Sequence, residues 1–220
     1  MDGIRRIGLG GVNCYLVAAG DGFVLIDNGT PKKRAKLEAE LAAAGCCPGK
    51  LRLIVLTHGD YDHAGNAAYL RDQYGTEIAM HREDAGRVET ADWDWGMKPK
   101  PDKFALTFQV VSRFIKPGPF DTFTPDVYVE DGQRLADYGL DAAVLHLPGH
   151  TKGSIGVLTR GADLFCGDLM DSTMGRPSLE FFIDDMPAAR ASLEKLRGLG
   201  MHTVYPGHGK PFPLARVKSV

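Results

Sequence analysis

Apolar and polar residues alternate along this chain with two periods, one typical of strands and one typical of helices. Short apolar runs rich in β-branched and aromatic residues, bounded by glycine or acidic residues, predict strands. These runs lie at 12–18, 22–27, 51–56, 77–80, 127–130, 142–147, 154–159, 163–167 and 203–206. The sequence Ala19-Gly20-Asp21-Gly22 between the first two runs is a hairpin signature, so we expect these runs to pair.

Three other segments repeat apolar residues at helical spacing. The first is predicted to begin at Thr30, whose hydroxyl would cap it, with Pro31 in the first turn, and to end at Gly45. The second covers 66–74 and the third 186–199. The three apolar stripes consist of Leu37, Leu41 and Ala44, then Ala67, Leu70 and Tyr74, then Met186, Ala189, Leu193 and Leu196. Strands inside and helices outside each half indicate a layered sandwich, a pattern that other α/β folds share.

Residues 86–126 interrupt this alternation with aromatic and proline residues. Their large apolar side chains are Trp93, Trp95, Met97, Phe104, Phe108, Phe114, Phe120 and Phe123, and their prolines include Pro99, Pro101, Pro117 and Pro119. A segment this long inside a compact domain is usually functional or partly helical. Three interpretations stay open: a helical cover over the core, a homodimer contact, or a lid that gives a substrate pocket an apolar wall.

Length, charge and hydropathy argue against several classes of binding partner. With 220 residues the chain is long enough for one domain, residues 1–220, with a substantial core. The formal net charge of -2 creates no field that would recruit nucleic acid or an anionic membrane. No apolar stretch approaches the ~20 residues of a membrane helix, and the first residues lack a signal-peptide core. We therefore expect a cytoplasmic protein with a small-molecule substrate and without nucleic-acid or membrane partners.

The densest group of chemically active residues is THGDYDHAG at 57–65, directly after an apolar strand. It places His58, Asp60, Asp62 and His63 within six positions. Burying imidazoles and carboxylates together is unfavourable unless a cation compensates the carboxylates. A divalent metal ion is the natural candidate for that cation.

Three more candidate ligands stand in glycine-bounded turns, each after its own apolar run. They are His150 in LHLPGHTKGS, Asp168 in LFCGDLM and His208 in VYPGHG. Glycine beside a ligand lets the backbone take tight or left-handed turns, which aims the side chain at a point. We therefore expect four ligand-bearing turns to converge at one edge of the sheet core.

The order HxDxDH, then GH, GD and GH, resembles the metallo-β-lactamase-fold hydrolase superfamily. The usual first motif of that family is HxHxDH, and this chain has Asp60 where the second histidine is expected. LIDNGT at 25–30 is similar to the early LIDTG turn of the family, so the resemblance spans nearly the whole chain. It implies an α/β (α+β) fold of the four-layer αββα sandwich type.

The resemblance also implies two adjacent metal ions, each with its own ligands and with one aspartate between them. By position, the ligands are His58, Asp60 and His150 for the first ion, Asp62, His63 and His208 for the second, and Asp168 as the bridge. In family members with one metal, the Asp62 position acts as base and proton shuttle, so we assign Asp62 a catalytic role beside ligation. Asp27 is expected to bond the ligand loop or a metal-bound imidazole.

Asp60 bears on which metals bind. A carboxylate in place of a neutral imidazole makes the ligand set one unit more negative, which favours iron or manganese relative to an all-histidine site. A similar change, with glutamate, occurs in the flavodiiron oxygen or nitric oxide reductases, but these also need a flavin-bearing domain, and none is present in this sequence. We expect two divalent ions, with zinc as first choice and iron or manganese as alternatives.

The chemistry that the resemblance implies is hydrolysis. Water shared by two cations has its pKa lowered from about 16 toward neutrality, which gives a hydroxide for attack on a carbonyl or phosphoryl centre. The leading hypothesis is a binuclear metallohydrolase for a small ester, thioester, lactone or related substrate. The alternatives are an iron-dependent oxidoreductase that uses O2 or a sulfur substrate, and a non-catalytic metal-binding protein. The sequence leaves the substrate undefined, because specificity in such folds lies in loops.

Overall fold

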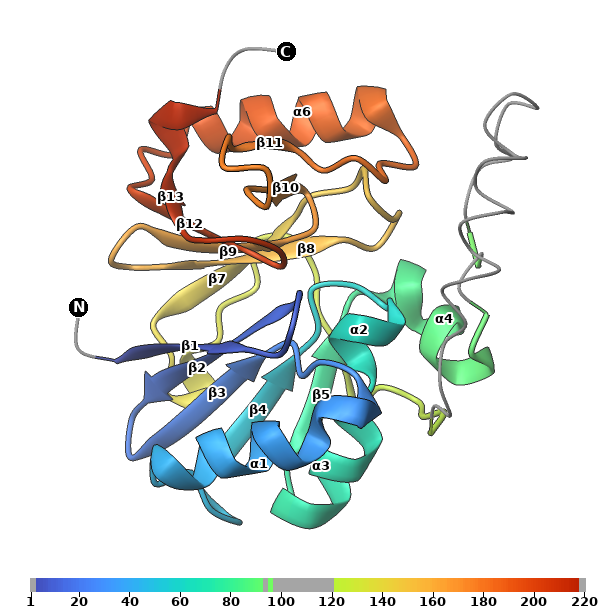
Figure 1. Ribbon diagram of the computed structural model, residues 1–220, viewed down its shortest axis with the longest axis vertical. Helices are drawn as coiled ribbons and strands as arrows, with labels where there is room; N and C mark the ends of the chain where they lie inside the picture. Colours follow the sequence, from blue (N-terminus) through green and yellow to red (C-terminus); the bar gives the residue numbers. More distant parts are fainter. Residues whose placement is uncertain (1–2, 93–94, 97–120, 218–220) are drawn as a thin grey trace.

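Two β-sheets dominate the computed structural model, which describes residues 3–92, 95–96 and 121–217. Figure 1 shows the sheets stacked between outer helices. The first sheet contains, in spatial order, β1 (Ile4–Gly8), β2 (Asn13–Ala19), β3 (Gly22–Ile26), β4 (Leu51–Val55), β5 (Glu77–Met80) and β6 (Val127–Tyr128). The second contains β13 (Phe212–Pro213), β12 (Thr203–Pro206), β9 (Asp163–Gly167), β8 (Ile155–Thr159) and β7 (Ala142–His146). A small ribbon pairs β10 (Met170–Asp171) with β11 (Ser178–Leu179).

The described helices include the three that the sequence predicts. The α-helices are α1 (Arg34–Ala43), α2 (Tyr61–Ala64), α3 (Ala67–Tyr74), α4 (Ala85–Thr90) and α6 (Met186–Arg197). The 3-10 helices are η1 (Pro31–Lys33), η2 (Arg82–Asp84), η3 (Ala136–Tyr138) and η4 (Leu214–Arg216). Two details of the prediction are wrong. Thr30 precedes the 3-10 helix η1 and not α1, and its side chain makes no capping hydrogen bond there. Met186 is 39% exposed, because it stands at the first position of α6, away from the buried stripe.

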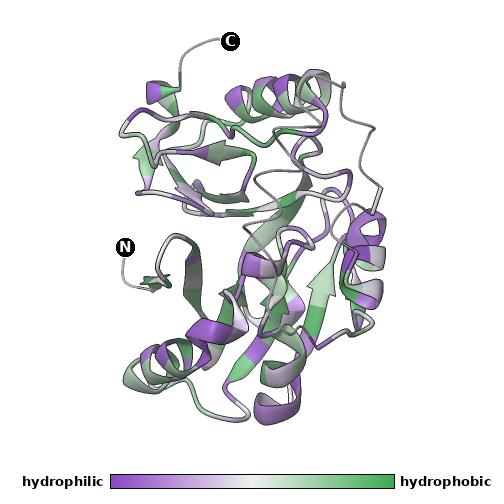
Figure 2. Ribbon diagram, turned by 45° about the vertical axis from the view of Figure 1, so that its right-hand side comes forward, coloured by the Kyte–Doolittle hydropathy of each residue, from purple (hydrophilic) through white to green (hydrophobic). Residues whose placement is uncertain are grey.

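Three apolar clusters separate the four layers of the molecule. The first, which includes Leu16 and Leu37, lies between the first sheet and helices α1 and α3. The second, which includes Val24 and Phe165, joins the two sheets. The third, which includes Leu193, lies between the second sheet and α6. Figure 2 shows the apolar colour concentrated on the strands, while the outer helices mix apolar and polar positions. The predicted αββα sandwich is therefore confirmed.

Parallel pairing brings the ends of several strands to a common edge. Strands β3, β4, β5 and β6 pair in parallel, and so do β9 and β12 of the second sheet. The loops that follow parallel strands leave the sheet at its carboxyl edge, where ligands of α/β proteins commonly bind. The predicted hairpin is also confirmed, because β2 and β3 are antiparallel and Ala19 faces Gly22.

The aromatic segment at 86–126 is described only in part. Helix α4 overlaps its start, and the Trp95 ring lies so close to Gly86 that a side chain at Gly86 would collide with it. Residues 93–94 and 97–120, on which the lid, core-cover and dimer interpretations mainly rest, lie outside the described residues. None of the described helices combines the length and apolar character needed to cross a membrane.

Candidate metal centre

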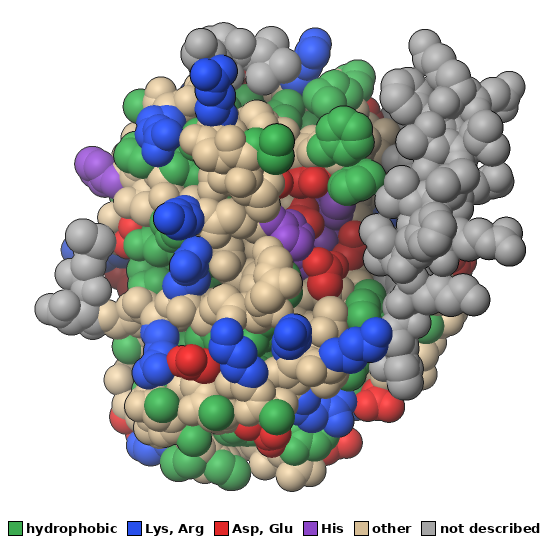
Figure 3. Space-filling view, viewed as in Figure 1, with side chains coloured by type: hydrophobic (Ala, Val, Ile, Leu, Met, Phe, Trp, Pro, Cys, Tyr) green, Lys and Arg blue, Asp and Glu red, His purple; other side chains and the backbone are tan. Residues whose placement is uncertain are grey.

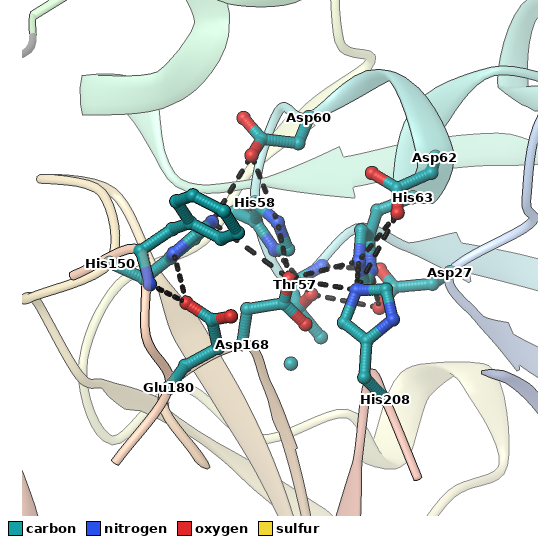
Figure 4. A network of polar contacts seen from close by, with 12 residues as sticks. Asp27, Thr57, His58, Asp60, Asp62, His63, His150, Asp168, Glu180 and His208 are labelled. Carbon is teal, nitrogen blue, oxygen red and sulfur yellow. Dashed lines mark hydrogen bonds and ion pairs between the residues drawn. The ribbon is translucent and has the colours of Figure 1, made fainter. Parts of the chain in front are cut away.

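The seven side chains predicted as ligands lie together at the carboxyl edges of the strands, as Figure 4 shows. They come from the segments that follow β4, β7, β9 and β12, with Asp62 and His63 on the short helix α2 after β4. The seven are His58, Asp60, Asp62, His63, His150, Asp168 and His208. In the space-filling view, histidine and acidic side chains gather in a hollow between the two halves of the molecule (Figure 3). The predicted convergence of four turns is therefore present.

The first group of donor atoms surrounds the Nε2 atoms of His58 and His150. The Asp60 Oδ2 atom lies 3.7 Å from His58 Nε2 and 3.1 Å from His150 Nε2. Asp168 Oδ2 lies 3.8 Å from His58 Nε2 and 3.9 Å from His150 Nε2. Ligand atoms of His58, His150 and Asp168 all lie within 4.8 Å of one another.

The second group contains Asp62, His63 and His208, whose ligand atoms also lie within 4.8 Å of one another. Asp62 Oδ2 is 3.5 Å from His208 Nε2, and the Nε2 atoms of His63 and His208 are 3.5 Å apart. Asp168 Oδ2 lies 3.3 Å from His63 Nε2 and 3.1 Å from His208 Nε2. One carboxylate oxygen thus belongs to both groups.

These separations fit the requirements of shared cations. Zinc holds nitrogen and oxygen ligands at about 2.1 Å in a tetrahedron, which places neighbouring donor atoms about 3.4 Å apart. The distances from Asp168 Oδ2 to four imidazole nitrogens range from 3.1 to 3.9 Å. The spacing of the donor atoms on both sides of Asp168 is therefore compatible with ligation of divalent metal ions.

Hydrogen bonds fix which nitrogen of His58 points into the centre. The Thr57 hydroxyl lies 2.8 Å from Asp27 Oδ2 and donates to it, because a carboxylate oxygen can only accept. The same hydroxyl lies 2.9 Å from His58 Nδ1 and must therefore accept from that ring nitrogen. His58 Nε2 is left with its lone pair, and it is buried without a hydrogen-bond partner among the described residues. An orphaned buried acceptor of this kind fits a metal ligand.

His63 and His208 are oriented in the same way. His63 Nδ1 lies 2.8 Å from Asp27 Oδ2, and His208 Nδ1 lies 2.9 Å from the carbonyl oxygen of Gly11. Both Nδ1 atoms therefore donate, and both Nε2 atoms face Asp168, where each can bind a metal ion in place of its proton. The expected contacts of Asp27, with the ligand loop and with an imidazole of the centre, are both present.

Backbone space matters at the turn that carries His208. A side chain at Gly207 would collide with the carboxylate of Asp168 and with the His63 ring. Only glycine lets the chain pass this close to the centre. The GH motif therefore contributes a close backbone approach as well as a candidate ligand.

The electrostatics of the centre are dominated by its carboxylates. Burial lowers the pKa of His58, which keeps its imidazole neutral. Burial also acts against charged His150 and His208, but Asp60 and Asp168 respectively outweigh it and raise the pKa of each histidine to about 9. The negative charge that stabilises a cationic imidazole there is equally favourable to a divalent metal ion.

The comparisons with known proteins agree with this geometry. The family model described as the metallo-beta-lactamase superfamily matches residues 7–208. The chain belongs to this superfamily. The superfamily consists mostly of metallohydrolases that bind divalent metal ions, so the observed donor groups lie in a fold that commonly carries such ions.

Two curated relatives illustrate how far the likeness extends. This chain is 34% identical over 124 residues to the hydroxyacylglutathione hydrolase GloC of Haemophilus influenzae, a match that covers 54% of this chain and 50% of that protein. The chain thus spans about half the length of this relative. An uncharacterised Mycobacterium leprae protein, ML0493, is 32% identical over 208 residues, which cover 90% of this chain and 86% of the relative.

Solved structures show the same superfamily fold. The structure of TTHA1623 in a di-iron-bound form superposes with a TM-score of 0.69 at 30% identity, covering 96% of this chain and 94% of that one. The B3 metallo-beta-lactamase BLEG-1 has a TM-score of 0.73 at 22% identity, covering 97% of this chain and 95% of its own, and supports the fold alone.

Sequence reasoning missed Asp84, which ties the two loops of the first group together. Its carboxylate accepts hydrogen bonds from Gly59 N at 2.9 Å, Thr151 Oγ1 at 2.8 Å and Gly153 N at 2.8 Å. Asp84 is 1% exposed, so these donors have replaced its water. Its place just after a parallel strand was the available signal, since such loops meet at the carboxyl edge.

Three further features of this superfamily member had no signal in the sequence. Glu180 is buried, and its Oε2 lies 3.9 Å from His150 Nδ1. The following residues, Phe181 and Phe182, are 85% and 45% exposed, with their rings in edge contact. Buried Arg87, on α4, forms an ion pair with Asp60.

The side chains of the predicted ligand set are assembled as expected, while their roles as ligands stay a prediction.

Proposed function

We propose that this protein is a binuclear metal-dependent hydrolase of small acyl substrates, such as esters, thioesters or lactones. The observation that carries the proposal is the position of Asp168 Oδ2, within 3.9 Å of four imidazole Nε2 atoms from three other loops. Such a cluster is unfavourable without a cation, and its two halves match the spacing of donors around two ions.

The bound ions would lower the pKa of a water molecule and polarise the acyl carbonyl, which is the chemistry that hydrolysis at neutral pH requires. The chain supplies the rest. Asp27 and Gly11 hold the imidazoles of His63 and His208 in the ligating tautomer. The Asp62 side chain is 39% exposed, so it can exchange protons with solvent and pass one to the leaving group.

Two observations support an acyl substrate. The Haemophilus influenzae relative is named a hydroxyacylglutathione hydrolase, and a hydroxyacylglutathione is a thioester. Near the centre, the exposed rings of Phe181 and Phe182 follow Glu180, whose carboxylate lies 3.9 Å from His150 Nδ1. Aromatic faces beside polar groups are typical of pockets for small molecules with an apolar part.

A second candidate is an iron-dependent oxidoreductase of the same fold. The di-iron-bound form of TTHA1623, at 30% identity, and the carboxylate at position 60 favour it. Zinc remains our proposal for the resident metal, because hydrogen bonds at Nδ1 direct the Nε2 atoms of His58, His63 and His208 into the centre, and imidazole suits zinc.

Metal analysis joined to a substrate panel tests both candidates. Protein purified without added metal would be analysed by mass spectrometry of its metals and by visible absorption. It would then be assayed on thioesters, lactones and phosphodiesters. We expect about two zinc ions per chain, no colour, and hydrolysis of at least one acyl class. Stoichiometric iron with visible absorption and O2 consumption would overturn the hydrolase proposal in favour of the oxidoreductase.

A further inference from the structure

Arg87 is a buried cation that directly contacts a predicted metal ligand. It lies on α4, is 2% exposed, and its Nη1 donates to Asp60 Oδ1 at 2.5 Å. The other oxygen of the same carboxylate, Oδ2, faces His150 Nε2 at 3.1 Å and His58 Nε2 at 3.7 Å. Asp60 therefore has one oxygen on the arginine and the other directed into the first metal group.

The arginine is held in place by the ligand loop itself. A Cβ added to Gly59 would lie 2.7 Å from Arg87 Cβ and 3.0 Å from its Cδ, so the aliphatic stem packs against the backbone between His58 and Asp60. Within the described part of the chain, Asp60 is the carboxylate that forms an ion pair with Arg87. An arginine buried this deeply is unfavourable without such a partner.

We propose that Arg87 is the positioning and charge-balancing partner of Asp60, so that the pair acts on the first metal ion as one neutral ligand. This inference rests on the proposed function. Arg87 restricts Asp60 to ligation through Oδ2 alone, and its positive charge cancels the extra negative charge that the carboxylate brings. The first group then has the net charge that a neutral imidazole at position 60 would give it. The preference for iron or manganese expected from Asp60 alone is thereby removed.

The proposal predicts how each substitution changes the charge around the first ion. Asp60→His leaves Arg87 as an uncompensated buried cation beside the first ion, which repels that ion. Arg87→Met keeps the aliphatic packing on Gly59 but makes the group one unit more negative. The double variant removes both charges and restores the balance. A purely structural Arg87 would behave differently, because its loss would add to the damage of Asp60→His.

The test is a double-mutant cycle on the full-length chain, read by zinc content after dialysis and by zinc affinity in chelator competition. We expect about two zinc ions in the wild type and about one in D60H, with the first site weakened at least tenfold. D60H/R87M should return to about two ions with an affinity within about threefold of the wild type. R82M is the matched control, since Arg82 is exposed and stacks on Tyr128 instead. R82M should retain both ions.

Competition between metals adds an independent measurement. In an equimolar mixture of zinc and manganese, R87M should take up at least threefold more manganese relative to zinc than the wild type does. Equal uptake by the two proteins, or a double variant no better than D60H, would overturn the inference. A wild type that binds two ions while the double variant fails rejects only the role of Arg87. A wild type that binds no metal rejects the proposed function as well.

Unfolding by urea keeps the idea testable if D60H does not fold. In metal-free protein, R87M should lower the urea midpoint of the wild type, because it leaves the Asp60 carboxylate without its cation. In a D60N background, R87M should lower the midpoint less or raise it, because the arginine removed there has no partner. Equal drops in the two backgrounds would contradict the charge pairing.

Discussion

The two groups of candidate ligands contain similar side chains but have different surroundings. In the first, the His58 and His150 side chains are 0% and 8% exposed, and the carboxylate of Asp60 is shared with Arg87. In the second, Asp62 is 39% and His208 is 22% exposed, and within the described part of the chain Asp62 pairs with imidazoles rather than with an arginine. The first group is therefore enclosed and charge-balanced, and the second is open and more negative.

The difference indicates that the two groups are suited to different roles. An enclosed, balanced group is suited to a firmly held ion, whereas an open group with a solvent-accessible carboxylate is suited to exchange with water and protons. The groups also differ in their supports. Asp84 links the loops around the first group, whereas Asp27 orients His63 in the second directly and His58 in the first through the Thr57 hydroxyl. Removing Asp84 therefore shows whether the second group depends on the first.

The largest effect is expected where the groups meet. Asp168→Ala removes the oxygen that both share, so we expect loss of both ions and a fall in kcat/KM of at least about 1,000-fold, corresponding to several kcal/mol. Metal content and steady-state kinetics measure it. Lys152→Ala, an exposed substitution close to His150, is the control and should keep both ions. Full activity in the Asp168 variant would refute the shared role.

A stability effect is expected from the support of the first group. Asp84→Ala leaves three buried donors without their acceptor, so the free energy of unfolding should fall by about 3 kcal/mol. Urea denaturation measures it, with the exposed neighbouring change Glu83→Ala as control. Zinc at the first site should weaken more than zinc at the second. An equal loss at both sites would mean that the groups are not independent.

A smaller effect is expected at the second group. Asp27→Asn places an NH2 group either at Oδ2, which accepts from His63 Nδ1 and the Thr57 hydroxyl, or at Oδ1, which accepts from the Thr57 backbone N–H. Either placement disturbs the orientation of His63 directly and that of His58 through Thr57. Zinc affinity at the second site should fall about 10- to 100-fold, as for other outer partners of metal-bound histidines. Competition with a chromophoric chelator measures it. An unchanged affinity would show that His63 is oriented by something other than Asp27.

The smallest effect is expected outside both groups. Phe181 is 85% exposed, so Phe181→Ala should change the free energy of unfolding by less than about 0.5 kcal/mol and leave both ions bound. For substrates with an apolar acyl group, KM should rise several-fold while kcat stays nearly constant, because the lost contact is one of binding. A fall in kcat with constant KM would show that the Phe181 ring is not part of the substrate pocket.

Much of this picture was accessible from residue patterns. Alternating apolar runs located most strands, and helical spacing located α1, α3 and α6, because burial of one face imposes these periods. Short elements such as α2 and β10 were missed, because two to four residues carry no period. The predicted start of the first helix at Thr30 was also wrong, because spacing does not distinguish the 3-10 turn of residues 31–33 from the α-helix that follows it.

The sequence by itself determined most strands, the longer helices and the set of ligand candidates, because burial periods and glycine turns after apolar strands are local signals. The αββα layering was implied by the family resemblance and not by these signals. Only the tertiary structure decided how the charges of the centre are balanced. Arg87 meets Asp60 across 27 positions of the chain, and Asp84 meets Gly153 across 69. Such contacts depend on which side chains are buried together and in which direction they point. These properties arise from packing between loops and are not encoded in any local pattern.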